Sequence, residues 1–345
     1  MRRLILAGAL LLMTPVEGLA QSAEPSADSA YLAYAADDHT ATLGSGRRIH
    51  VVCLGEAAPT VILTAGLGDW GATWRAVQGA VAEQARVCAW DRPGFGFSDA
   101  SPEAQTSDAT TSDLEEALAA ADIHGPYVMV GHSLGGAETL LFTDRNPELV
   151  VGMVLVDSIF PDQASRLQEA APVSTAIDAR ELSAAAAALR QCASDLAAGA
   201  VSSVGPDPNG CLRTSPAYPS SVAAALIRLD SNPLRQATRA STFENVFRSS
   251  ALLANPARDY GDMPLVVLTA GEEPDDIPDE MTDWDAQQAA WEAAHREFAS
   301  MSSRGVNRVV QGAGHYIQID RPDVVIAAIL EVVDAVRSQE SQSSP

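Results

Sequence analysis

The sequence predicts an α/β fold, in which helices cover both faces of a mostly parallel sheet and a helical cap is inserted over one end. Short runs of Val, Ile and Leu alternate with longer runs of helical periodicity. Continuous apolar strands separated by helices are typical of a parallel sheet that is buried on both faces. The alternation stops between about residues 160 and 260, which are rich in Ala, Ser and Pro, and this break predicts the insertion.

The alternating runs define the expected elements, and right-handed crossovers between parallel strands restrict their order. The expected strands are Ile49–Leu54, Thr60–Thr64, Arg86–Trp90, Tyr127–Val130, Val151–Val156, Leu265–Leu268 and Asn307–Val310. The expected helices are Thr73–Gln84, Ser112–Ala121, Ala137–Arg145, Trp284–Ser300 and Pro322–Val336. Helical pieces at Ala179–Leu189 and Val222–Leu229 lie in the insertion, which we interpret as a cap that shapes a substrate pocket. The alternative is a purely structural elaboration.

The first residues are typical of an export signal. A charged start, Met1-Arg2-Arg3, precedes an apolar run from Leu4 to Met13 and small residues that end at Ala20. This order is that of a secretory signal peptide, whose apolar run is too short to span a bilayer as a lasting helix. We therefore expect residues 1–20 to be removed and the protein to be secreted or periplasmic.

The rest of the chain is expected to form one domain. Residues 21–44 are rich in Ser, Ala and Asp and are expected to be a flexible lead-in. Residues 45–345 then have the usual length of a single α/β domain, with the cap at about 160–260. No other segment is long and apolar enough to cross a membrane, so no stable membrane insertion is expected. Nothing in the sequence specifies the oligomeric state.

The chain is strongly acidic. Its formal net charge is −23, and all 22 basic residues are Arg. Such a surface repels nucleic acid and anionic lipid, so neither is expected as a partner. The charge bears on solubility, and the chemistry has to be sought in individual residues.

Four cysteines in a chain with an export signal indicate disulfides. Cys53 and Cys88 each lie in an expected strand, and Cys192 and Cys211 lie in the insertion. The economical pairing is Cys53 with Cys88 and Cys192 with Cys211, one of three possible connectivities. The alternative is four buried free thiols. No cysteine spacing is that of a zinc site or of a redox pair.

Gly131-His132-Ser133-Leu134-Gly135 has the pattern G-x-S-x-G, with an apolar strand before it and a helical pattern after it. A strand, a sharp turn and a helix are the context in which this pattern carries a nucleophilic serine. Both glycines are needed because a Cβ at either position would collide with the neighbouring strand or helix. The turn lifts Ser133 Oγ clear of the sheet and places it at a helix N-terminus, which favours developing negative charge.

A serine nucleophile needs a base within hydrogen-bond reach, and His315 is the best candidate. It follows Gly314 between the last expected strand and the last expected helix. Imidazole titrates near neutral pH, so it can accept the serine proton and return it to a leaving group. The other histidines are expected to be packing or surface residues: His39, His50, His124, His132 and His295.

The acid that orients His315 has two candidate positions. Asp157 ends an expected strand, where a carboxylate can be buried and held rigidly. Asp275, with Asp276 behind it, lies in the acidic loop after Leu268, which leads through one helix to the strand before His315. Either position gives the chain order Ser, Asp, His. The alternative for the loop is a solvated acidic surface run.

An acyl-transfer serine also needs donors for the oxyanion. We expect the backbone N–H of Leu134, directly after the nucleophile, to be one donor. The second is expected from the Gly-rich loop Thr64–Trp70, and we assign it to the N–H of Leu67. Such a loop can instead cradle a phosphate, but neither a following Lys-Ser/Thr nor a dinucleotide-binding spacing is present. No metal and no organic cofactor is implied.

Taken together, these residues resemble the α/β-hydrolase superfamily. The resemblance covers about Ser45 to Arg337, and it implies an eight-stranded, mostly parallel sheet. It also places the strand of Cys53 beside that of Cys88, which favours the first disulfide. The cap lies outside the resemblance, which therefore implies nothing about the identity of the substrate. Four landmarks carry it: Ala65-Gly66-Leu67-Gly68, Asp91-Arg92-Pro93-Gly94-Phe95-Gly96-Phe97-Ser98, the motif around Ser133, and Gly314-His315.

The chain departs from the superfamily pattern in two places. Many relatives carry His-Gly where this chain has Ala65-Gly66, beside the second oxyanion donor. Many also carry Gly-x-x-Asp after the seventh strand, where Pro274 occupies that spacing here. This second departure is the reason for ranking Asp157 ahead of Asp275. Similar proteins that act on epoxides or haloalkanes use Asp as the nucleophile, so Ser133 argues against those activities.

The residues predict a serine hydrolase that cleaves small carboxylic esters through a Ser-His-Asp triad and an acyl-enzyme intermediate. The alternatives on the same triad are a peptidase, a thioesterase or a lactonase. A non-catalytic binding protein on the same fold is the alternative from a different class, and an intact Ser133 and His315 argue against it. Trp70 and Trp74 are candidates either for the acyl pocket or for ordinary core packing.

Overall fold

The computed structural model describes residues 27–35, 39–202, 207, 209–212, 214–255, 257–272 and 277–343. Within them, eight strands form one sheet in the order β1-β2-β4-β3-β5-β6-β7-β8. β2 is antiparallel to β1 and to β4, and every other pair of neighbours is parallel, so the predicted fold class is confirmed. The strands are β1 (Thr40–Thr42), β2 (Arg48–Leu54), β3 (Thr60–Thr64), β4 (Arg86–Trp90), β5 (Tyr127–His132), β6 (Val150–Val156), β7 (Leu265–Ala270) and β8 (Gly305–Val310).

The helices follow the expected alternation closely. α3 begins at Ser107 instead of the expected Ser112, because the Thr106 side chain caps it by accepting the N–H of Ala109. The helices that flank the sheet are α1 (Ala27–Ala33), α2 (Arg75–Ala82), α3 (Ser107–Ala120), α4 (Leu134–Arg145), α10 (Trp284–Ala299), α11 (Ile317–Asp320) and α12 (Pro322–Ser343). The helices between β6 and β7 are α5 (Gln163–Ala170), α6 (Pro172–Ala197), α7 (Ser220–Asp230), α8 (Pro233–Glu244) and α9 (Val246–Leu252).

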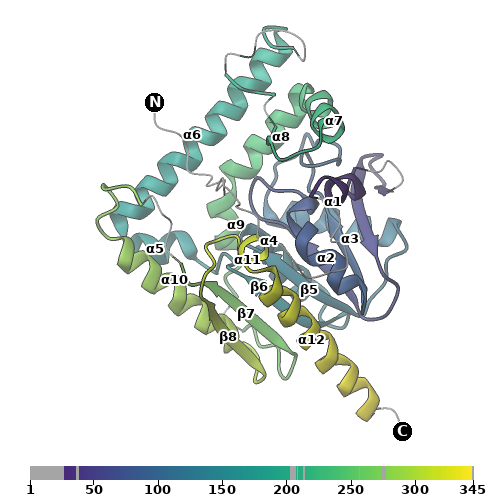
Figure 1. Ribbon diagram of the computed structural model, residues 1–345. Helices are drawn as coiled ribbons and strands as arrows, with labels where there is room; N and C mark the ends of the chain where they lie inside the picture. The colour runs from purple at the N-terminus through teal and green to yellow at the C-terminus, as the bar shows by residue number, and fades with distance from the viewer. Residues whose placement is uncertain are drawn as a thin grey trace, which may run out of the picture.

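Helices cover both faces of the sheet (Figure 1). α2 and α12 pack on the face that carries Val61 and Leu63 of β3. α3 and α4 pack on the opposite face, which carries Ile62, and α10 covers the same side farther along the sheet. Because successive strand residues face opposite sides, a strand covered on both sides has to be apolar throughout, as β3 is. No helix among the described residues combines the length and apolarity needed to span a bilayer.

Part of the expected flexible lead-in has regular structure. α1 carries Tyr31 and leads to Tyr34, and both side chains are buried against the core. The Tyr34 ring meets the Trp70 ring edge-on, with 6.2 Å between centroids. Two aromatic side chains thus anchor this short segment, which has no apolar period. The expected signal peptide, residues 1–20, lies outside the described residues.

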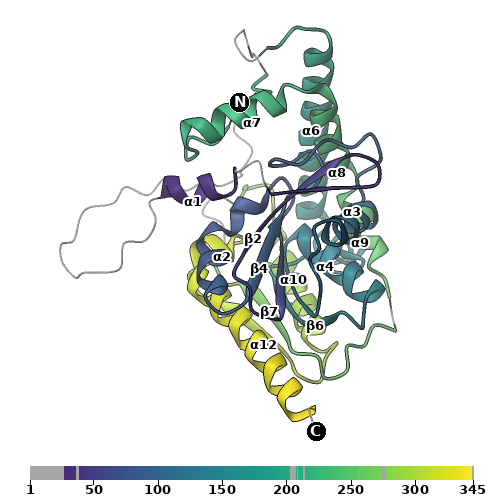
Figure 2. The same cartoon turned by 90° about the vertical axis from the view of Figure 1, so that its right-hand side faces the viewer.

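α5 to α9 form the cap, and the described part of the chain between β6 and β7 contains no strand. Figure 2 shows α6, α7 and α8 beyond one end of the sheet, with α12 on one side of the sheet and α4 on the other. α8 is tied to the loop after β4: the Arg235 guanidinium donates to Ser98 O at 2.6 Å, and that of Arg239 donates to Gly94 O at 2.7 Å. Since β4 runs parallel to its neighbour β3, the cap covers the carboxyl ends of the parallel strands.

Two disulfides are present, with the pairing expected from the sequence. Cys53 of β2 is bonded to Cys88, its register partner on β4. Cys192 of α6 is bonded to Cys211, in the segment that leads to α7. The first links two strands of the sheet, and the second links two parts of the cap.

Candidate active site

Ser133 lies in a strained turn between β5 and α4. Its φ of 51° and ψ of −121° are values that a residue with a side chain rarely adopts. The Ser133 N–H donates to Val156 O at 3.1 Å, and the Ser133 carbonyl accepts the N–H of Ile159 at 3.1 Å. Hydrogen bonds to β6 and to the segment after it therefore hold the turn in this conformation.

Two glycines make the turn possible. A Cβ on Gly131 would come within 3.0 Å of the backbone of Gly135, and a Cβ on Gly135 would come as close to the backbone oxygens of Thr64 and Ala65. These are the collisions that the sequence predicts. The close approach of α4 to β3 brings the N-terminus of α4 to the edge of the sheet, directly after Ser133.

His315 and Asp157 lie side by side at the same edge. His315 Nδ1 is 2.7 Å from Asp157 Oδ2. Asp157 directly follows β6 and has a positive φ of 40°, and its N–H donates to Leu268 O of β7 at 2.8 Å. Ser133 and Asp157 are thus both held in sparsely populated backbone conformations, which tend to cluster at functional sites.

The other oxygen of Asp157 has two further donors. The backbone N–H of Ala270 and the indole N–H of Trp291 each donate to Oδ1 at 3.0 Å. Asp157 is 4% exposed, so its charge is balanced by these contacts and not by water. Burial raises the pKa of Asp157, but the hydrogen bond and charge of His315, the charge of His295 and the N–H of Ala270 outweigh it and lower the pKa to about 2.

His315 is set to hold a proton more tightly than a free imidazole does. Burial lowers its pKa, but the hydrogen bond and the charge of Asp157 and the charge of Asp69 outweigh burial, so the pKa is raised. The His315 side chain is still 44% exposed, which leaves the imidazole accessible from outside. In the described residues Ser133 Oγ makes no hydrogen bond. Contacts of a catalytic serine are often long until substrate binds.

His132, which the sequence predicts to be a packing or surface residue, is part of this arrangement. Its side chain is 1% exposed, and its Nε2 lies 2.9 Å from the backbone oxygen of His315. The two imidazole rings are 4.7 Å apart. Burial and the charge of His315 lower the pKa of His132 to about 3, so the ring is neutral and Nε2–H is the donor. His132 therefore supports the loop that carries His315.

His295, also expected to be a packing residue, lies behind Asp157. Its Nδ1 is 2.8 Å from Thr269 Oγ1, and its Nε2 is 2.9 Å from Ser158 O. Thr269 Oγ1 in turn accepts a hydrogen bond from Asn307 at 2.8 Å. This chain of hydrogen bonds joins α10 to the ends of β6, β7 and β8. Burial lowers the pKa of His295.

Trp291 and His295 are four residues apart, so they lie on the same face of α10. This spacing was the signal in the sequence that could have shown both residues facing the sheet. It could not have shown which strand end they contact, because that depends on how α10 packs.

The loop after β3 carries Leu67, one of the two expected oxyanion donors, and α4 begins with the other, Leu134. Arg92 fixes this loop: its guanidinium donates to the backbone oxygens of Ala65 and Gly66, the latter at 2.9 Å. Glu138 of α4 holds Arg92 with contacts of 2.5 and 2.6 Å, and both side chains are buried. These contacts therefore fix the position of the Thr64–Trp70 loop, in which Ala65-Gly66 departs from the superfamily pattern.

Asp69 is a carboxyl near the site that the sequence did not single out. Its Oδ2 is buried without a hydrogen-bond partner in the described structure. Gly66 leaves it room, because a Cβ there would lie 3.1 Å from Asp69 Oδ2 and 2.7 Å from His132 Nδ1. Burial raises the pKa of Asp69 to about 6, although the charges of Arg92 and His315 lower it.

The remaining candidates are placed as follows. Asp275 and Asp276 lie outside the described residues. Trp74 is fully buried in the core, and the indole N–H of Trp70 donates to the hydroxyl of Tyr218 at 2.9 Å, so both tryptophans pack in the core. Among the described residues, no group of three or more His, Cys, Asp or Glu side chains has the arrangement of a metal site.

Comparison with known proteins identifies the family. Residues 61–328 match the sequence model of the alpha/beta hydrolase family. The protein belongs to this family, as its sheet order, its cap and the turn at Ser133 indicate. An uncharacterized protein of Bacillus subtilis, YqjL, is 34% identical over 111 residues, which are 32% of this chain and 44% of that protein. The matching stretch thus spans less than half of that relative.

Solved structures show the same fold. A loop variant of the haloalkane dehalogenase DbeA from Bradyrhizobium elkanii aligns with 88% of this chain and 98% of its own, at 19% identity and a TM-score of 0.60. A thermophilic esterase from Thermogutta terrifontis aligns with 86% of this chain and 98% of its own, at 20% identity and a TM-score of 0.52. These likenesses extend over almost the whole of each neighbour and concern the fold alone.

Proposed function

We propose that this protein is a serine hydrolase that cleaves carboxylic esters, with Ser133 as nucleophile, His315 as base and Asp157 as the orienting acid. The observation that carries the proposal is the 2.7 Å contact between His315 Nδ1 and Asp157 Oδ2, at the edge of the sheet where Ser133 occupies its strained turn. A nucleophile, a base and a buried carboxylate at the carboxyl ends of neighbouring strands are the groups that acyl transfer requires.

In this mechanism Ser133 Oγ attacks the ester carbonyl while His315 Nε2 accepts its proton. The backbone N–H groups of Leu67 and Leu134 stabilise the oxyanion of the tetrahedral intermediate. His315 then gives the proton to the departing alkoxide, which leaves an acyl group on Ser133. A water molecule, deprotonated by His315, cleaves this acyl-enzyme, releases the carboxylic acid and restores the serine.

Asp157 stays ionised throughout this cycle. Its pKa of about 2 lies far below neutral pH. It accepts a hydrogen bond from the Nδ1–H of His315, which leaves the lone pair on Nε2 for Ser133, and it stabilises the imidazolium that forms. The N–H groups of Ala270 and Trp291 hold the carboxylate in the orientation that this role requires.

The same triad is suited to peptides, thioesters and lactones, which are the alternative substrates. The structural neighbours include a haloalkane dehalogenase, but at 19% identity that likeness concerns the fold alone. Serine at position 133 supports acyl transfer over the activities in which this fold uses an aspartate nucleophile. The two disulfides support a secreted or periplasmic location, since disulfides persist in oxidising compartments.

Hydrolysis of p-nitrophenyl acetate by the purified protein tests the proposal. We expect turnover by the wild type and a loss of about 10⁴-fold or more in kcat for Ser133→Ala and for His315→Ala. A matched control is Ser165→Ala, in an exposed turn of α5, which should retain full activity. Turnover that survives Ser133→Ala would contradict the proposal, because the nucleophile would then be elsewhere.

A further inference from the structure

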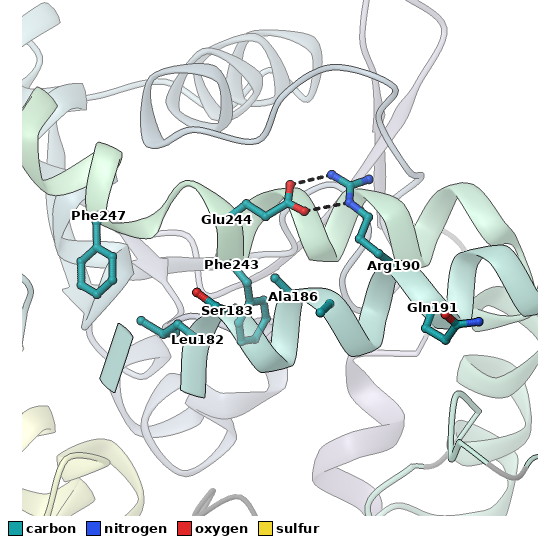
Figure 3. A pocket seen from close by; sticks show the side chains of 9 residues that line it. Leu182, Ser183, Ala186, Arg190, Gln191, Phe243, Glu244 and Phe247 are labelled. Carbon is teal, nitrogen blue, oxygen red and sulfur yellow. Dashed lines mark hydrogen bonds and ion pairs between the residues drawn. The ribbon is translucent and has the colours of Figure 1, made fainter. Parts of the chain in front are cut away.

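A groove in the cap lies between α6 and the junction of α8 with α9. Its volume is about 580 Å³, and Leu182, Ala186 and Ala187 of α6 line one side. Phe243 and Phe247 line the other side (Figure 3). This volume falls in the range of pockets that hold small organic ligands, roughly 300 to 1,000 Å³. The groove is separate from the residues proposed above as the triad.

Phe243 connects the groove to the proposed oxyanion loop. Its ring carbon Cζ lies 3.6 Å from the position that a Cβ on Gly68 would take. Gly68 directly follows Leu67, whose N–H is the proposed oxyanion donor. Arg235 and Arg239, earlier on the same helix, fix α8 to the loop after β4. The Phe243 wall of the groove therefore lies next to the loop on which the ester carbonyl would be held.

The lining of the groove changes along its length. Leu182, Ala186, Phe243 and Phe247 form a mainly apolar half, which also contains the hydroxyl of Ser183, and Arg190, Gln191 and Glu244 form a polar half (Figure 3). Arg190 and Glu244 are joined by two contacts of 2.8 and 2.6 Å.

In the polar half, Arg190, Glu244 and Gln191 each have a hydrogen-bond partner within the protein. Gln191 donates to Asp195 at 2.8 Å, in addition to the pairing of Arg190 with Glu244. These charged and amide groups already satisfy one another, so no charge in the lining calls for an opposite charge on the ligand. The chemistry of the groove therefore favours an uncharged, apolar occupant.

The length of the groove sets the size of that occupant. Residues 182 and 190 are eight positions apart on α6, which at 1.5 Å per residue is about 12 Å. The apolar half, from Leu182 to Ala187, measures about 7 Å. An extended chain advances about 1.2 Å per bond, so the apolar half accommodates about six bonds and the whole groove about ten.

From this geometry we propose that the groove binds the acyl chain of the ester substrate, and that the protein prefers acyl chains of medium length, about six to ten carbons. The inference rests on the proposed function. Each methylene that enters the groove leaves water, and partial burial of a methylene corresponds to roughly a twofold gain in kcat/KM. Acetyl esters are too short to reach the groove and gain nothing from it.

Two alanines on α6 provide a matched test. Ala187 and Ala184 are both exposed, but only Ala187 lines the groove. The variants Ala187→Phe and Ala184→Phe are compared with the wild type on p-nitrophenyl acetate and p-nitrophenyl octanoate, so that only the acyl group varies. We expect the wild type to prefer octanoate by at least tenfold in kcat/KM, and Ala187→Phe to lose that preference while its acetate turnover stays within twofold of wild type. Ala184→Phe should behave as the wild type on both esters.

A flat chain-length profile in an active wild-type protein would overturn this inference and leave the proposed function standing. Equal behaviour of Ala187→Phe and Ala184→Phe on octanoate would overturn it as well, since the groove would then not hold the acyl chain. Absence of hydrolysis with every ester, acetate included, would overturn the proposed function and this inference with it.

Discussion

Replacing Asp157 with Asn changes which nitrogen of His315 carries the proton. Asp157 Oδ1 accepts the N–H groups of Ala270 and Trp291, and Oδ2 lies 2.7 Å from His315 Nδ1. In Asp157→Asn, the two N–H donors hold the amide oxygen at the Oδ1 position and turn the NH₂ group toward His315. An NH₂ group cannot accept a hydrogen bond from Nδ1–H, so the proton moves to Nε2. His315 then presents an N–H to Ser133 instead of a lone pair.

The magnitude follows from this change of tautomer. A triad with the wrong histidine tautomer typically loses about 10⁴-fold in kcat. The loss of stability is smaller, because the difference between the folded pKa of about 2 and an unfolded value of about 4 corresponds to about 2 to 3 kcal/mol at neutral pH. We therefore expect Asp157→Asn to fold and to be almost inactive.

The assay is kcat on p-nitrophenyl acetate, with folding checked by circular dichroism. Asp162→Asn is the control within the same segment, since Asp162 is exposed at the start of α5, and it should retain full activity. Asp275→Asn should cost no more than a few-fold. A loss of three or more orders of magnitude in kcat for Asp275→Asn, with less than a tenfold loss for Asp157→Asn, would show that Asp157 does not orient His315.

Three further predictions follow from the same site and from the cap. The raised pKa of His315 places the acid limb of kcat/KM above pH 6.5, and Asp69→Asn, which removes a neighbouring carboxyl that raises this pKa, should move the limb to lower pH. The stability from the pairing of His315 with Asp157 is lost as pH rises through that pKa, and an acid limb below pH 6.5 in the wild type would contradict the raised pKa. Trp291→Phe keeps an aromatic ring but removes one hydrogen-bond donor to Asp157. We expect kcat to fall about tenfold with KM unchanged, and the acid limb of kcat/KM to move to higher pH. A purely structural role of Trp291 would lower only the melting temperature. The double variant Cys192→Ser with Cys211→Ser should lose about 3 kcal/mol in urea unfolding, and an unchanged midpoint would show that this crosslink does not constrain the unfolded chain.

Most of the sheet could be predicted from the sequence because its strands are buried on both faces and so read as continuous apolar runs. β3 and β6 are of this kind. β1 could not be predicted, because it has three residues and buries only Ala41. Its pairing with β2 depends on tertiary contacts that leave no local pattern.

The candidate site was predictable where a local pattern imposes a geometry. Ser133 is such a case, because its turn needs glycines at fixed positions. The position of Asp157 beside His315 is a long-range property: it depends on which strand end faces the loop after β8, and two strand ends qualified. Trp291 contacts Asp157 across a separation of 134 residues, so only the packing of α10 shows that it belongs to the site.

Covalent labelling shows directly whether Ser133 is an activated nucleophile. The purified protein is incubated with a fluorophosphonate, and intact mass and peptide mapping locate the adduct. We expect one adduct per chain, on Ser133, that is absent in Ser133→Ala and forms far more slowly in Asp157→Asn. No adduct on the wild-type protein, or an adduct that persists in Ser133→Ala, would contradict it.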